Sequence, residues 1–155
     1  MPPALTMRAD PKTKPDPRLT LQSRLDDLSL VWPWVDALGG EYAVSAETLF
    51  AIHLCLEEAL SNIIRHGYLT HTDKPITIEC KATAPRNLVF TIEDQAPPFD
   101  PVAPASAEGA PPPSSIDELK VGGHGINLLR RFAGSLRYER LPDGNRLAIG
   151  FSIRT

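Results

Sequence analysis

The chain has 155 residues, which is enough for one domain with a substantial core and too few for two ordinary domains. Charged residues make up 23% and apolar residues 42% of the sequence, with a formal net charge of -3, and this composition disfavours nucleic acid as the main partner. No apolar run approaches the roughly 20 residues that cross a bilayer, and the N-terminus lacks the apolar core of a signal peptide, so we expect a cytoplasmic protein.

The sixteen prolines are unevenly distributed along the chain. Residues 1–18 are polar and rich in proline, so we expect a disordered tail there and a single domain over residues 19–155. A second proline-rich stretch occupies residues 95–122, between two well-patterned parts of the chain. Long loops inside compact domains are usually lids, binding loops or disordered segments, and this stretch is expected to be one of them.

The first patterned segment alternates apolar and polar residues over Leu19–Leu25, which predicts a short edge strand. Asp26 or Asp27 can then cap a helix that runs to Leu38 and stops at the glycine pair that follows.

A longer helix is predicted from Ser45, a suitable N-cap, to about His66, with Gly67 as the residue that ends it. At 3.6 residues per turn, the helix presents one apolar stripe that we expect to pack on the sheet: Leu49, Ile52, Leu56, Ala59, Leu60 and Ile63. The neighbouring row is polar throughout and predicts a solvated face: His53, Glu57, Ser61 and Arg65.

Alternation and turn residues predict the remaining elements: strands Ile76–Ala82, Asn87–Glu93, Ser135–Arg140 and Arg146–Ile153, and a helix Gly123–Ala133. The last two strands are joined by Pro-Asp-Gly-Asn, which is typical of a hairpin turn. This order of elements indicates an α+β fold, with helices on one face of a mixed, mostly antiparallel β-sheet.

Glu58 and Asn62 follow Phe50 and Leu54 in a third row of the long helix, so both should lie in a partly covered position. A carboxylate can accept a proton and an amide oxygen can ligate a hard cation such as Mg²⁺. Phosphoryl transfer needs this combination of base and metal ligand. The same pair is also common as a solvent-facing or hydrogen-bonded pair, so the spacing alone leaves both interpretations open.

Asp94 ends the strand FTIED and opens the proline-rich loop. A carboxylate in this place can accept a hydrogen bond from an exocyclic amine such as that of adenine, or it can simply cap the loop. Gly122, Gly123 and Gly125 precede the next helix, where backbone N–H groups can converge on phosphates; a flexible hinge is the alternative. The chain has neither a P-loop motif nor the glycine motif of a Rossmann fold.

Three segments in this order resemble the conserved boxes of the histidine-kinase-like ATPase superfamily, in particular the branch of anti-sigma-factor serine protein kinases. LEEALSNIIRHGY is similar to the N box, with its Glu, Asn and His at Glu58, Asn62 and His66. The two glycine boxes are similar to IEDQAPPFDP and GGHGINLLRRFAGSLRYER. The resemblance covers residues 19–155 and implies a two-layer, Bergerat-type fold with residues 95–122 as the ATP lid.

The resemblance implies ATP and Mg²⁺ as cofactors. It assigns Asn62 as the Mg²⁺ ligand, Asp94 as the acceptor of the adenine amine and Glu58 as the general base. The base would act on a serine or threonine hydroxyl of a protein substrate. In this branch the substrate is a small STAS-domain anti-anti-sigma protein, the second partner is a sigma factor, and homodimers occur.

The glycine boxes supply the other expected ATP contacts. The resemblance implies phosphate contacts at Gly123 and Gly125 beside Gly122, and Lys120 either reaches a phosphate or is a solvated lysine. The first glycine box usually reads Asp-x-Gly, and this chain has Ala96 at the third position. The methyl group of Ala96 restricts close backbone approach to adenine, so we expect reduced ATP affinity. A nucleotide-binding switch without catalysis, controlling a partner protein, is therefore the alternative to a kinase.

Overall fold

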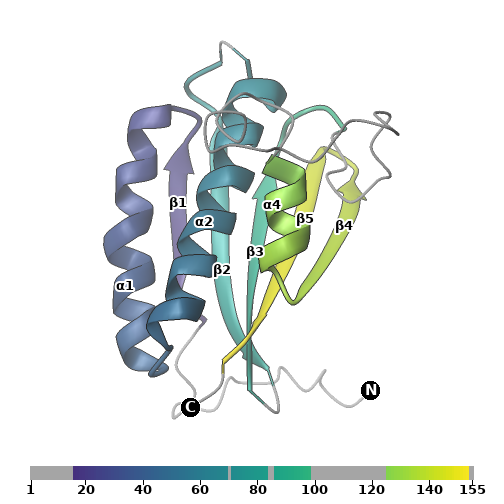
Figure 1. Ribbon diagram of the computed structural model, residues 1–155. Helices are drawn as coiled ribbons and strands as arrows, with labels where there is room; N and C mark the ends of the chain where they lie inside the picture. Colours follow the sequence, from purple (N-terminus) through teal and green to yellow (C-terminus); the bar gives the residue numbers. More distant parts are fainter. Residues whose placement is uncertain (1–15, 70, 84–85, 99–124, 154–155) are drawn as a thin grey trace, which may run out of the picture.

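The computed structural model describes residues 16–69, 71–83, 86–98 and 125–153. These residues form two layers, a β-sheet and a layer of helices on one of its faces (Figure 1). The sheet has five strands in the order β1-β2-β3-β5-β4, and each neighbouring pair is antiparallel: β1 (Arg18–Gln22), β2 (Pro75–Thr83), β3 (Asn87–Asp94), β5 (Gly144–Ser152) and β4 (Ser135–Leu141). The α+β prediction is confirmed, with no parallel pair among these strands.

Within the described residues, three α-helices cover the sheet: α1 (Val31–Glu41), α2 (Ala46–Asn62) and α4 (Gly125–Phe132). In Figure 1, α2 crosses the middle of the sheet between α1 and α4. A 3₁₀-helical segment, Leu25–Leu30, precedes α1, and a π-helical segment, Ile63–Gly67, continues α2. Among the described helices, none is long and apolar enough to cross a membrane.

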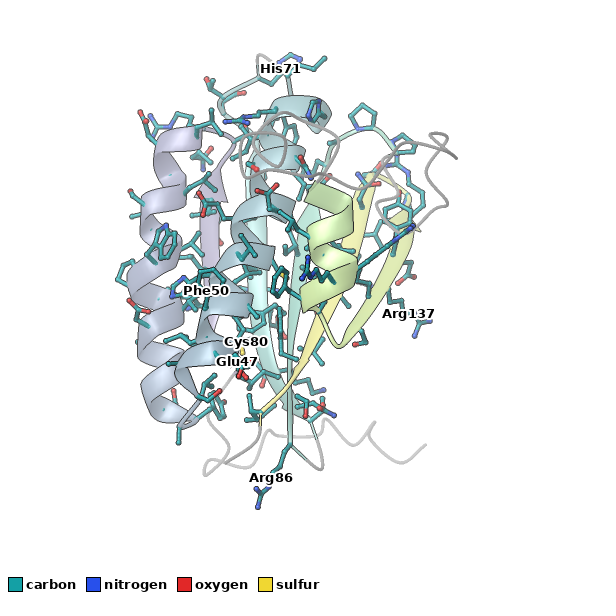
Figure 2. The ribbon with its side chains drawn as sticks, viewed as in Figure 1. Glu47, Phe50, His71, Cys80, Arg86 and Arg137 are labelled. Carbon is teal, nitrogen blue, oxygen red and sulfur yellow. The ribbon has the colours of Figure 1, made fainter. Side chains whose placement is uncertain are left out.

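The core lies between the helices and one face of the sheet. Side chains that alternate along β2 and β3 are completely buried, because successive residues of a strand point to opposite faces: Ile76, Ile78, Cys80, Leu88, Phe90 and Ile92. The apolar stripe expected on α2 is buried against them, except that Leu49 is only partly covered. Figure 2 shows Arg86 and Arg137 extending outward from the rim of the sheet, away from this core.

The expected limits of the first helix are wrong. Asp26 and Asp27 lie within the 3₁₀-helical segment, where Asp27 Oδ2 accepts a hydrogen bond from Gln22 N at 2.9 Å, and α1 begins only at Val31. Helix α1 also continues through the glycine pair. A Cβ atom on Gly39 would lie 2.8 Å from a methyl carbon of Leu49, so this glycine allows close packing of α1 on α2 and does not end the helix.

The end of α2 also differs from its expected form. Gly67 was predicted to end the helix as a C′ residue, but it lies within the π-helical segment, and the residue with positive φ is Leu69, at 55°. Tyr68 N donates to Ile63 O at 2.9 Å, which closes the wider turn. The helix therefore delivers Tyr68 into the interior, where its side chain is only 3% exposed.

His53 is buried, although its row on α2 was predicted to be solvated. Its side chain stacks on Trp32 of α1 with ring centroids 4.3 Å apart, and its Nε2 lies 2.8 Å from Asp36 Oδ1. Glu57 and Arg65 in the same row are exposed, as predicted. The difference arises because α1 covers only the first part of this face, which the periodicity of α2 cannot show.

The N-cap predicted at Ser45 is confirmed, because Ser45 Oγ accepts a hydrogen bond from Thr48 N at 3.2 Å. We expect Ser45→Ala to lower the free energy of unfolding by about 1 kcal/mol and Ser45→Gly by only a few tenths of that. Chemical denaturation of the three proteins tests this. An alanine variant as stable as the wild type would show that the cap contributes nothing to stability.

Candidate functional site

A small hollow, partly open to solvent, lies where the end of α2 approaches the end of β3, the start of β5 and the helix α4. Its lining is mostly apolar, with a few polar side chains: Ala59, Asn62, Ile63, Gly67, Asp94, Ala96, Leu129, Tyr138, Asn145 and Leu147. Three of the predicted site residues, Asn62, Asp94 and Ala96, therefore line one hollow, although they come from separate parts of the chain.

Asp94 is the buried carboxylate of this hollow, with 7% of its surface exposed. Its Oδ1 accepts hydrogen bonds from Ala96 N at 2.8 Å and from Asn145 Nδ2 at 2.9 Å. Burial raises the pKa of Asp94 above its ordinary value, while these two hydrogen bonds and the charge of Arg140 oppose that change. Both described hydrogen bonds use Oδ1, so the carboxylate is oriented by one oxygen.

Asn145 is the residue of this site that the sequence interpretation missed. It lies directly opposite Asp94 in the β3–β5 register, and its Nδ2 also donates to Ala96 O at 3.1 Å and to Pro97 O at 3.0 Å. Its Oδ1 accepts a hydrogen bond from Tyr138. In the sequence, Asn145 stands out only as the last residue of the predicted hairpin turn.

Two neighbours of Asn145 complete the support of the loop after β3. Arg140 Nη1 donates to Ala96 O at 2.9 Å. A Cβ atom on Gly144 would lie 1.7 Å from Asp94 O, so only glycine permits this approach of β5 to the end of β3. The loop residues Asp94, Gln95 and Ala96 are therefore held on the side that faces the sheet. Their contacts there are with side chains of β4 and β5 and with the backbone at Gly144.

Asn62 and Glu58 lie one helical turn apart at the end of α2, and both are partly buried, as predicted. Asn62 lines the hollow, whereas Glu58 does not. Burial raises the pKa of Glu58, the negative charge of Glu57 raises it further, and Arg65 opposes both. A carboxyl with a raised pKa is better suited to proton transfer near neutral pH than an ordinary surface glutamate.

The second glycine box is only partly visible. Lys120, Gly122 and Gly123 lie outside the described residues, as does most of the predicted lid, and Gly125 begins α4. The proposed tail also lies outside them up to residue 15, and β1 begins at Arg18, just before the expected start of the domain.

The donor set of the described residues suits Mg²⁺ bound together with a phosphate. No group of three or more His, Cys, Asp or Glu side chains in this part of the chain could hold a metal ion by itself. Mg²⁺ is commonly held by one or two protein oxygens, with phosphate oxygens and water completing the octahedron. The amide oxygen of Asn62, at the edge of the hollow, fits that role.

Comparison with known proteins agrees with this architecture. Residues 21–151 match a family model described as the histidine kinase-like ATPase domain. The chain is 30% identical over 116 residues to the serine/threonine-protein kinase BtrW of Bordetella bronchiseptica, covering 75% of this chain and 79% of that protein.

Solved structures show the same fold at lower identity. The RsbU and RsbW domains of Rv1364c from Mycobacterium tuberculosis match with a TM-score of 0.64 at 13% identity, over 90% of this chain and 32% of that one. The histidine kinase domain of a blue-light activated kinase from Erythrobacter litoralis matches with a TM-score of 0.51 at 17% identity, over 83% of this chain and 60% of that one.

Proposed function

The chain belongs to the histidine kinase-like ATPase family, and we propose that it is an ATP- and Mg²⁺-dependent serine/threonine protein kinase. The observation that carries this proposal is the shared hollow, whose lining includes both the buried carboxylate of Asp94 and Asn62, with Glu58 one helical turn before Asn62 on α2. The family is one of ATPase domains, which implies ATP binding, and the relative from Bordetella bronchiseptica is named a serine/threonine kinase.

The lining of the hollow suits adenine in its chemistry. Its walls include Ile63, Leu129 and Leu147, which can pack against a purine ring, and among the described residues of its lining Asp94 is the one with an acidic side chain. Because Oδ1 of Asp94 already accepts two hydrogen bonds, we assign the acceptance of the adenine amine to Oδ2. Ala96 forms the neighbouring wall of the base site.

The phosphate end of the site is assigned to the end of α2 and the start of α4. Asn62 would ligate Mg²⁺, which neutralises charge on the phosphates during transfer. Gly122, Gly123 and Gly125 would contribute backbone N–H groups, and Lys120 a positive charge. Glu58 would accept the proton of the attacking serine or threonine hydroxyl as its oxygen bonds to the γ-phosphorus.

The substrate and partners follow from the same family branch. We propose a STAS-domain anti-anti-sigma protein as the substrate and a sigma factor as a regulated partner, in the cytoplasm, without direct contact with nucleic acid or membrane. A homodimer is the proposed assembly, since twofold dimers are the commonest arrangement of soluble proteins.

Phosphotransfer from ATP to STAS-domain proteins of the same genome, together with ATP binding measured by calorimetry, tests the proposal. Transfer to a serine or threonine of one of them supports the kinase. If ATP binds and no STAS-domain protein is phosphorylated, the kinase proposal fails. The alternative, a nucleotide-binding switch without catalysis, then remains; it is favoured by Ala96, which stands in place of the glycine of the first glycine box.

We expect Asn62→Ala to weaken ATP binding in Mg²⁺ by about 10- to 100-fold, because the metal would lose its protein ligand. The difference between affinities measured with Mg²⁺ and with EDTA should also shrink. Asn87→Ala, at the opposite end of β3, is the matched control and should bind like the wild type. An Asn62→Ala protein with unchanged Mg²⁺ dependence would contradict the assignment.

A further inference from the structure

The turn that ends α2 lies against the loop that carries Asp94. The π-helical segment Ile63–Gly67 leads into Tyr68, which is 3% exposed. Segments of π-helix occur frequently at functional sites, because the wider turn redirects the side chains that follow it. Here the redirected side chain is Tyr68, which reaches the backbone immediately after Asp94.

The hydroxyl group of Tyr68 joins three parts of the chain. It donates to Pro75 O, at the start of β2, at 2.9 Å and accepts a hydrogen bond from Gln95 N at 2.6 Å. Burial raises the pKa of Tyr68, so its hydroxyl stays protonated at neutral pH and keeps both hydrogen bonds. Gln95 lies between Asp94 and Ala96, so this bond holds the centre of the loop.

A second contact beside this hydrogen bond is steric. A Cβ atom on Gly67 would lie 2.9 Å from Ala96 Cβ, closer than real Cβ atoms approach, so these two positions have room for one methyl group. Ala96 is 3% exposed, and its N–H donates to Asp94 Oδ1. Any displacement of Ala96 by a side chain at position 67 would therefore be transmitted to the carboxylate.

We propose that Tyr68 is a positioning residue for base recognition, and that it acts with the Gly67–Ala96 contact to aim Asp94 at the exocyclic amine. This inference rests on the proposed ATP site. Asn145 and Arg140 hold the loop from the sheet, and Tyr68 and Gly67 hold it from the helix. Selectivity for a purine with an amine therefore depends on residues that do not touch the base amine.

The test compares the dissociation constants of ATP and of purine riboside triphosphate, which lacks the exocyclic amine, by calorimetry. The wild type should bind ATP about tenfold or more tightly than the analogue, because the analogue leaves the buried carboxylate without its donor. Tyr68→Phe should bring the ratio of the two dissociation constants close to one, because it should weaken the binding of ATP and not that of the analogue. Tyr42→Phe, at a partly buried tyrosine on the α1–α2 connection, should keep the wild-type ratio of dissociation constants.

Rescue of the steric contact provides the second measurement. Gly67→Ala should lower the ratio of the two dissociation constants. Gly67→Ala combined with Ala96→Gly should restore that ratio, because positions 67 and 96 together then carry one methyl group, as in the wild type. Thermal unfolding of each variant separates a change in positioning from a loss of the folded protein.

Three results would overturn the inference. The first is a Tyr68→Phe variant whose ratio of dissociation constants equals that of the wild type. The second is a double variant, Gly67→Ala with Ala96→Gly, whose ratio is no higher than that of Gly67→Ala alone. Equal binding of the two nucleotides by the wild type would remove the assignment of Asp94 itself, and with it this inference. That result would contradict the proposed ATP site itself, whereas the first two results would contradict only the positioning role of Tyr68 and Gly67.

Discussion

Glu58→Gln is expected to bind ATP like the wild type and to transfer phosphate to its protein substrate about 10²- to 10⁴-fold more slowly. Glutamine has nearly the same size and retains the partly buried packing of Glu58 on α2, but it cannot accept the proton of the attacking hydroxyl. Calorimetry with ATP and a phosphotransfer assay on the same preparation measure the two properties separately.

The pH dependence of transfer provides an independent check on Glu58. The base must be ionised, so the rate should rise with pH through the pKa of Glu58, which burial places above its ordinary value. The charge of Glu57 raises that pKa further. Glu57→Gln, the matched control on the adjacent exposed residue, should therefore keep a high rate and shift the acidic limb to lower pH.

Any of three results would contradict this role. Glu58→Gln with wild-type transfer would show that another group, or water, accepts the proton. Equal losses of transfer in Glu58→Gln and Glu57→Gln would show that transfer depends on the negative charge of this helix face and not on one general base. Loss of ATP binding in Glu58→Gln would indicate a structural role at the end of α2.

Asp94→Asn is expected to weaken ATP binding by about 10- to 100-fold without unfolding the protein. The asparagine Oδ1 can still accept the hydrogen bonds from Ala96 N and Asn145 Nδ2. Its NH₂ group would replace Oδ2, so a donor would face the donor of the adenine amine. Asp143→Asn, in the exposed hairpin turn, is the control and should bind ATP normally.

The stability of Asp94→Asn has an expected sign as well. Because burial raises the pKa of Asp94, the folded state favours the neutral carboxyl. The stability contributed by this group is full at pH below the ordinary value of 3.8 and is lost as pH rises through the raised pKa. At neutral pH the Asn variant should therefore unfold at a denaturant concentration no lower than the wild type.

A variant that is much less stable at neutral pH would contradict this account, because it would mean that the ionised carboxylate contributes net stability in the fold. Unchanged ATP affinity in Asp94→Asn would show that Asp94 does not accept a hydrogen bond from the adenine amine. Chemical denaturation and calorimetry on the same variant distinguish these two outcomes.

Much of the fold was predictable from local patterns. Strict alternation placed β2 and β3 correctly, because a strand that packs on one face must bury every second residue. The stripe on α2 and the cap at Ser45 were predictable for similar reasons, since both depend only on neighbours along one helix. The sequence also identifies Asn62, Asp94 and Ala96 as candidate site residues, and all three line one hollow.

The sequence by itself determined the order and type of most elements, the core-facing stripe of α2 and the candidate chemistry of Glu58, Asn62 and Asp94. Only the tertiary structure decided which neighbours surround them. His53 is buried because α1 covers it. Asn145 contacts Asp94 because the β3–β5 register places them opposite each other, and Tyr68 reaches Gln95 because a π-helical turn precedes it. These features arise from contacts between residues distant in the chain, which periodicity along a single element does not encode.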